Sequence, residues 1–231
     1  MTSPALLRSL FVTALAVLGI SALALGIGSS IAQPADLAKW EKEMSAFEAA
    51  DKTHPPPHEA ILFVGSSSIR LWTNLTAAFP KHKIINRGFG GSQIADSVAL
   101  AERIILPYNP RMVVLYAGDN DIANGNSPEQ ILADFKKFVG TIHGARPGTT
   151  IAFISIKPSP SRWHLSDKQK AANQLIKALC EREKQLSYID VFTPMLDTNG
   201  EPRAELFVED KLHLNPKGYE LWKSVIGPYL K

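Results

Sequence analysis

The most restrictive feature of this chain is the regular alternation, from residue 61 onward, of short apolar runs with longer amphipathic segments. The five runs are too short for ordinary helices: Ile61 to Val64, Lys83 to Asn86, Met112 to Ala117, Thr150 to Ser155 and Ser187 to Val191. Helical spacing of apolar residues marks the segments around 69–79, 94–106, 128–145, 167–185 and 216–230. Apolar strands that alternate with helices predict a parallel sheet covered on both faces, so we expect a three-layer α/β/α domain with five strands.

Composition and charge exclude several classes of protein. Hydrophobic side chains make up 45% of the chain and charged ones 20%, which are values typical of a globular protein. The net charge of +3 is small and scattered, so no nucleic-acid partner is expected. Cys180 is the single cysteine, which excludes an intrachain disulfide and a cysteine-based zinc site. His54, His58, His82 and His143 lack ligand spacing such as H-E-x-x-H, so we expect them in solvated or core roles and not as metal ligands.

The N-terminal residues 1–32 predict an export signal. They contain no acid and a single base, Arg8, followed by an apolar run from Leu10 to Ile27. Ser30 and Ala32 supply the small side chains that a signal peptidase requires, which predicts cleavage after Ala32. The run approaches the roughly 20 residues that span a bilayer, so an uncleaved membrane anchor is the alternative. In either case the rest of the chain is exported, to the periplasm or the medium, and only this segment would contact a membrane.

A separate amphipathic helix is expected just after the signal. Leu37, Trp40, Met44 and Phe47 follow one another at spacings of 3, 4 and 3 residues, which predicts one buried stripe. We favour a helix packed on the domain surface over one with a binding role. Prolines at positions 55–57 end it. The predicted organisation is a signal or anchor at 1–32, a helix and linker at 33–57, and the main domain at 58–231.

Ligands of such sheets bind beyond the carboxyl ends of the strands, so the loops after the apolar runs are the places to look for chemistry. The first of these loops reads Gly65-Ser66-Ser67-Ser68-Ile69. Taken alone it is typical of a helix cap, and Ile69 breaks the G-x-S-x-G nucleophile elbow.

The second loop, Asn86-Arg87-Gly88-Phe89-Gly90-Gly91-Ser92, offers backbone N–H groups that suit an anion. A dinucleotide fingerprint would need glycine at Gln93, so a nucleotide site is not expected. The third, Gly118-Asp119-Asn120-Asp121, is typical of a turn or helix cap as much as of a site.

A carboxylate and an imidazole stand three residues apart near the end of the chain. Asp210 precedes His213 in a turn, and Asn215 and Pro216 then predict the N-cap and first residue of the last helix. At this spacing the carboxylate can bind one ring nitrogen and leave the other free, as a general base requires.

Together, in this order, the four blocks resemble the SGNH (GDSL-type) hydrolase family of serine esterases and lipases, from about Ile61 to Trp222. The resemblance implies a flavodoxin-like sheet of order 2-1-3-4-5. It also implies a Ser67 nucleophile, a triad completed by Asp210 and His213, and an oxyanion hole formed by Ser67, Gly91 and Asn120. Ser66 replaces the aspartate of the family's usual Gly-Asp-Ser, which leaves the choice among Ser66, Ser67 and Ser68 open.

Several further residues receive weaker predictions. Arg162 and Trp163, after the fourth run, are candidate substrate contacts, with a self-packed loop as the alternative. Asp96 and Asp121 are interpreted as partners of helix dipoles, with a role in orienting the loops near the site as the alternative. Cys180 is expected to face the core.

The resemblance implies a serine esterase that hydrolyses carboxylic esters with side chains and water, so no metal or organic cofactor is expected. The signal segment predicts that this esterase is exported. We expect small acyl groups such as acetyl, carried by carbohydrate or cell-wall material, so its partner is a small-molecule or glycan ester. The alternatives are a lysophospholipase or thioesterase acting on long acyl chains and, less favoured, a non-catalytic carbohydrate-binding protein.

Overall fold

Five parallel strands form one sheet in the order β2-β1-β3-β4-β5, as the sequence predicted. Their bounds are β1 Ile61–Gly65, β2 Ile84–Gly88, β3 Met112–Tyr116, β4 Thr150–Ile154 and β5 Leu186–Ile189. The computed structural model describes residues 37–231, so the predicted signal and its cleavage site lie outside the described residues. Among residues 37–231, no helix combines the length and apolarity needed to cross a membrane.

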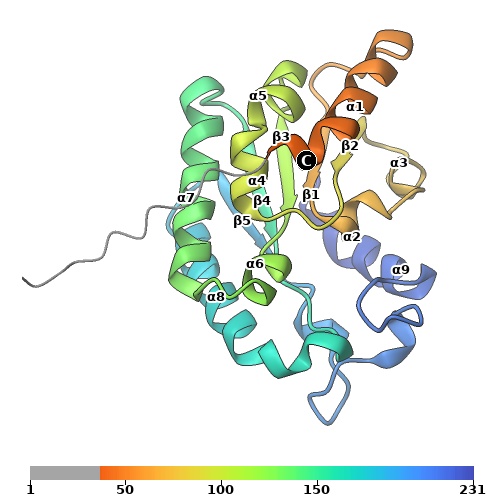
Figure 1. The fold of residues 1–231 in the computed structure, drawn as a ribbon, viewed down its shortest axis with the longest axis vertical. Coiled ribbons are helices and arrows are strands. Elements are labelled where there is room, and N and C mark those ends of the chain that lie inside the picture. Colours follow the sequence, from red (N-terminus) through yellow and green to blue (C-terminus); the bar gives the residue numbers. More distant parts are fainter. Residues whose placement is uncertain (1–36) are drawn as a thin grey trace, which may run out of the picture. The chain divides into compact units, whose positions relative to one another are not determined.

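Helices cover both faces of this sheet (Figure 1). One face carries α1 (Glu41–Thr53), α4 (Ile94–Ala99), α5 (Ala101–Ile104), α7 (Pro128–Ala145) and α8 (Ser166–Cys180). The other face carries α2 (Ser67–Arg70), α3 (Leu75–Ala78) and α9 (Pro216–Ile226). The short helix α6 (Asp119–Ala123) follows β3. This is the predicted three-layer α/β/α architecture.

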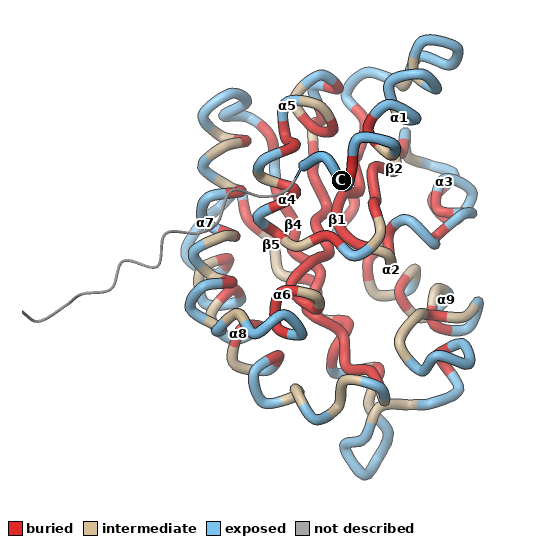
Figure 2. The backbone as a smooth tube through the Cα atoms, in the orientation of Figure 1, coloured by how far each residue is buried: buried red, intermediate tan, exposed pale blue. Residues whose placement is uncertain are grey.

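Side chains alternate between the two faces of the sheet along each strand, so the hydrophobic core has one part on each face. In β1, Ile61 and Phe63 pack with the α9 side, whereas Leu62 and Val64 pack with the α7 side. All five residues of β1 are buried, because it lies between two strands and under two helical layers (Figure 2). Cys180 is buried in the α8 stripe, as predicted, and burial raises the pKa of its thiol to about 12.

Two predicted helices are broken in the structure. The segment 69–79 forms α2 and α3, separated by a turn at Thr73 and Asn74, residue types that favour turns over helix interiors. The segment 94–106 forms α4 and α5, followed by the 3₁₀ turn Leu106–Tyr108. Each of these two segments therefore packs as two short helices in place of one long helix.

The N-terminal helix begins later than predicted. Residues Leu37–Trp40 form a 3₁₀ turn and α1 starts at Glu41. Leu37, the first residue of this turn, is exposed. The prediction that Leu37 belongs to the buried stripe is therefore wrong, whereas Trp40 and Met44 are buried as expected.

Candidate active site

A sharp turn after β1 presents Ser67. Gly65 has φ of +127°, and a Cβ there would lie 1.9 Å from the carbonyl oxygen of Tyr116, so only glycine fits. The N–H of Ser66 donates to that same carbonyl at 3.0 Å, which fixes the turn against β3. Ser67 then begins α2 at the carboxyl end of β1.

The three consecutive serines have different surroundings. Ser66 and Ser68 are buried, whereas Ser67 is half-buried and faces the imidazole of His213. Its Oγ lies 2.9 Å from His213 Nε2. Of the three hydroxyls, the one on Ser67 is therefore placed next to a base.

The turn before α9 supplies that base with an acidic partner. His213 Nδ1 lies 2.5 Å from Asp210 Oδ2, and Asp210 Oδ1 accepts the N–H groups of Leu212 and His213 at 2.8 and 2.9 Å. Although partial burial opposes ionisation, the bonds from His213 and Leu212 lower the pKa of Asp210 to about 2. Asn215 caps α9 as predicted, accepting the N–H of Gly218 at 3.1 Å.

Three groups point their donors at the space beside Ser67. The backbone N–H groups of Ser67 and Gly91 donate to no acceptor within residues 37–231 and remain available. Asn120 follows β3 on the opposite side of β1, and its Nδ2 donates one hydrogen to the carbonyl oxygen of Ser92 at 3.0 Å. Its second amide hydrogen is left for a ligand. The strand order brings these groups together, because β1 lies between β2 and β3.

Asp121 is a positioning residue that sequence reasoning undervalued. Its carboxylate accepts the N–H of Ile94 at 3.0 Å and that of Gly118 at 2.9 Å, so it ties the loop after β2 to the loop after β3. Burial raises its pKa to about 6 in spite of these bonds. Its bond to the N-cap residue Gly118 fits the helix-start interpretation, and its bond to Ile94 of α4 fits the alternative that it orients the loops. Asp96 does cap its own helix, by accepting the N–H of Gln93.

A chain of charged groups runs behind Asn120. Lys157 Nζ donates to Asp119 Oδ2 at 2.9 Å, and both side chains are buried. Arg162 Nη1 lies 2.9 Å from the other oxygen of Asp119 and also bonds Asn120. Burial alone would raise the pKa of Asp119, but the neighbouring cations of Lys157 and Arg162 lower it.

Of the two predicted substrate contacts, the structure brings Arg162 but not Trp163 to the cavity. The ring of Trp163 packs near Phe192, with 6.4 Å between ring centroids, and the ammonium of Lys170 lies 5.1 Å from its centroid. These contacts fit the alternative of a loop that packs on itself.

A cavity of about 440 Å³ opens over Ser67 and His213, and we call it the Ser67 cavity. Most of its lining residues carry polar side chains: Glu43, Ser67, Arg70, Gly90, Gly91, Asn120, Arg162, Leu212 and His213. Glu43 comes from α1, so the N-terminal helix forms part of the wall. That helix is fixed by Asp51, which accepts bonds from Arg87 and Tyr108 at 2.5 Å each.

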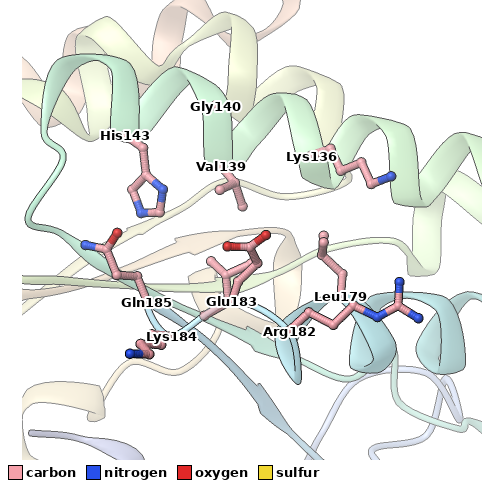
Figure 3. Close-up of a pocket in the computed structure, with 10 residues that line it drawn as sticks. Lys136, Val139, Gly140, His143, Leu179, Arg182, Glu183, Lys184 and Gln185 are labelled. Carbon is pink, nitrogen blue, oxygen red and sulfur yellow. The ribbon is translucent and has the colours of Figure 1, made fainter.

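A larger hollow of about 720 Å³ lies at the other end of the sheet, near the start of β5 (Figure 3). We call it the amino-end hollow. It is formed between α7 and the segment that joins α8 to β5, and its lining includes Lys136, His143, Arg182 and Lys184. The His143 ring is bonded to the carbonyl oxygen of Thr149 at 3.0 Å. None of the nucleophile, base or oxyanion candidates lies there.

Comparison with known proteins agrees with this geometry. Residues 59–221 match the model of the GDSL-like Lipase/Acylhydrolase family, which is well over half of the chain. The chain belongs to this family. It is therefore a serine hydrolase that acts on ester bonds, and the resemblance seen in the four sequence blocks is confirmed. No curated protein matches the chain by sequence.

Solved structures share the fold at low identity. A Streptococcus pneumonia protein named for platelet activating factor superposes with a TM-score of 0.74 at 22% identity, over 84% of this chain and 94% of that one. An acetyl esterase superposes with a TM-score of 0.59 at 16% identity, over 73% of this chain and 94% of that one. A carbohydrate esterase family 3 protein from Talaromyces cellulolyticus superposes with a TM-score of 0.59 at 16% identity, over 75% of this chain and 96% of that one. At these identities the likeness establishes the fold alone.

Proposed function

We propose that this hydrolase is an exported esterase that removes small acyl groups, such as acetyl, from a carbohydrate or cell-wall ester, with Ser67, His213 and Asp210 as its triad. The observation that carries the triad is the 2.9 Å contact between Ser67 Oγ and His213 Nε2, with Asp210 bound to the far ring nitrogen. These two contacts join the nucleophile, the base and the acid that orients the base, as a catalytic triad requires.

Each step of the reaction has a group in place. Ser67 Oγ attacks the ester carbonyl while His213 Nε2 takes its proton, and Asp210 stabilises the imidazolium that forms. The N–H groups of Ser67 and Gly91 and the amide of Asn120 bind the oxyanion. When the tetrahedral intermediate collapses, His213 returns the proton to the leaving alcohol. Water, activated by the same imidazole, then cleaves the acyl-enzyme and regenerates Ser67.

The polar lining of the Ser67 cavity supports a small acyl group and a polar alcohol. Leu212 is the one large apolar side chain among the lining residues, so the cavity has no continuous wall of apolar side chains for a long acyl chain. A lipid substrate would need such surface, because burying each CH₂ is worth about 0.8 kcal/mol. The long-chain alternative is therefore less favoured.

Arg70 offers a contact for the polar part of the substrate. It follows Ser67 by three residues on α2, lines the same cavity, and has no side-chain hydrogen bond or ion pair within residues 37–231. A Cβ at Gly90 would lie 2.8 Å from its Nε, so the absence of a side chain there lets the guanidinium lie against the oxyanion loop. Its free N–H groups suit hydroxyl or carboxylate oxygens of a glycan.

A chain-length series of p-nitrophenyl esters, from acetate to a long acyl chain, tests this function on the 33–231 protein. We expect acetate to be cleaved best, and acetylated glycans to release acetate. A long-chain preference would overturn the small-acyl proposal, and inactivity on every ester would favour the carbohydrate-binding alternative.

Export is tested separately, in cells that produce the full chain. We expect the protein outside the cytoplasm with Gln33 as its first residue. A full-length chain in the membrane fraction would favour the uncleaved anchor, and a full-length chain in the cytoplasm would contradict export.

A further inference from the structure

We propose that Arg162 is a positioning residue that fixes and polarises the Asn120 amide as an oxyanion donor, and that the buried Lys157–Asp119 pair holds Arg162 in place. This inference rests on the proposed function. It assigns a task to two buried charges that the triad mechanism leaves unused.

The contacts of Asn120 determine which way its amide points. Its Oδ1 accepts bonds from both Nη1 and Nη2 of Arg162, at 3.1 and 3.2 Å. A guanidinium has only donors, so the amide oxygen must face it and the NH₂ group must face the other way. There, Nδ2 binds the carbonyl oxygen of Ser92 with one hydrogen, and the other hydrogen is left for the oxyanion. Without Arg162, the amide could rotate and present its oxygen to a negative charge.

The same contact strengthens the donor. A cation that binds the amide oxygen draws electron density from the nitrogen, and such polarisation is cooperative along a hydrogen-bonded chain. Arg162 and Lys157 contribute two positive charges against the single negative charge of Asp119. The cluster therefore keeps one excess positive charge beside the place where the oxyanion forms.

The anchor of Arg162 is rigid because it is buried. The side chain of Lys157 is 1% exposed and that of Asp119 is 5% exposed, and Asp119 Oδ1 also lies 3.5 Å from Gln169 Nε2. Burial alone would lower the pKa of Lys157, but the adjacent carboxylate of Asp119 raises it, so the ammonium stays charged. The N–H of Ser161 donates to the carbonyl oxygen of Lys211 at 3.2 Å, which joins the Arg162 loop to the turn that holds His213.

A double-mutant cycle tests the proposal on an ester that the wild type hydrolyses. Arg162→Gln should lower kcat by about 10- to 100-fold, less than loss of the donor itself, with a smaller change in KM. Arg162→Lys should recover part of the loss, because it restores the charge without the two-pronged contact. In the Asn120→Ala background, Arg162→Gln should have almost no further effect, since the group it positions is absent.

The matched control is Arg203→Gln, which removes another arginine from a carboxylate pair, the exposed contact with Glu205. It should leave kcat unchanged, and thermal melting should show each variant folded. Additive losses from Arg162→Gln and Asn120→Ala, or a loss confined to KM, would overturn the proposal.

A measurement without substrate separates this inference from the proposed function. In ¹⁵N-labelled protein, the two Asn120 side-chain amide protons should shift and exchange faster in Arg162→Gln. Unchanged amide signals would contradict the positioning role whatever the activity. Failure of the wild type to cleave any ester would overturn the proposed function while the amide measurement still decides the inference.

Discussion

The two ends of the sheet carry hollows of opposite character. The amino-end hollow is larger, at about 720 Å³, but its charged side chains Lys136, Arg182, Glu183 and Lys184 make no ion pair or hydrogen bond with one another. The Ser67 cavity is smaller, at about 440 Å³, yet five loops contribute hydrogen-bonded polar groups to it. The comparison teaches that convergence of prearranged groups, rather than volume, marks the site of chemistry.

The largest effect should come from the triad. Ser67→Ala or His213→Ala should each lower kcat by roughly 10⁶, and the double variant should lose hardly more, because the residues act as a unit. Steady-state kinetics on p-nitrophenyl acetate measures this. If the loss of kcat in the double variant equals the product of the two single losses, the assignment of catalysis to the Ser67 cavity is contradicted.

The oxyanion hole comes next. Asn120→Ala should lower kcat by about 10²–10³ with little change in KM, since the donor acts mainly in the transition state. Asn120→Asp keeps the size but replaces the donor with a charge of the wrong sign and should do no better. A loss that appears in KM instead would assign Asn120 to ground-state binding.

Asp121 has a buried carboxylate at the carboxyl end of the sheet, and this group should make the free energy of unfolding depend on pH. The carboxyl titrates near 3.8 when unfolded and near 6 when folded, so the unfolded state loses its proton first as pH rises. The wild type should therefore lose about 3 kcal/mol of unfolding free energy, relative to Asp121→Asn, between about pH 4 and 6. Denaturant unfolding of both proteins across this range measures the difference, and a constant difference would contradict the raised pKa.

Arg70 distinguishes substrate binding from catalysis within the Ser67 cavity. Arg70→Gln should raise KM about tenfold for an acetylated acidic glycan, because a charge-assisted bond is worth about 1.5–3 kcal/mol. The effect should weaken in high salt. An unchanged KM would remove Arg70 from the substrate site.

The smallest effect should come from the amino-end hollow. Lys136→Gln and Arg182→Gln should change kcat/KM by less than about twofold, because they are surface substitutions remote from the triad. A loss comparable with that of Asn120→Ala would overturn the comparison of the two ends.

The local hydrophobic pattern of the sequence was sufficient to predict the architecture. Each strand overlaps a predicted run, and the helix α7 shows its buried stripe directly in the spacing of Ile131, Phe135, Phe138 and Ile142. The hydrophobic pattern failed at the start of the N-terminal helix, where residues Leu37–Trp40 form a 3₁₀ turn and Leu37 is exposed. Element boundaries depend on such local turns, which hydrophobic periodicity does not encode.

The sequence by itself determined the five-stranded α/β/α fold, the family, and the loops in which site residues would be found. Only the tertiary structure decided which of three serines meets the imidazole, because Ser67 and His213 are 146 residues apart and packing alone sets their distance. It also moved Arg162 from a candidate substrate contact to a partner of Asn120. Long-range contacts of this kind follow from strand order and burial, and no local spacing in the chain records them.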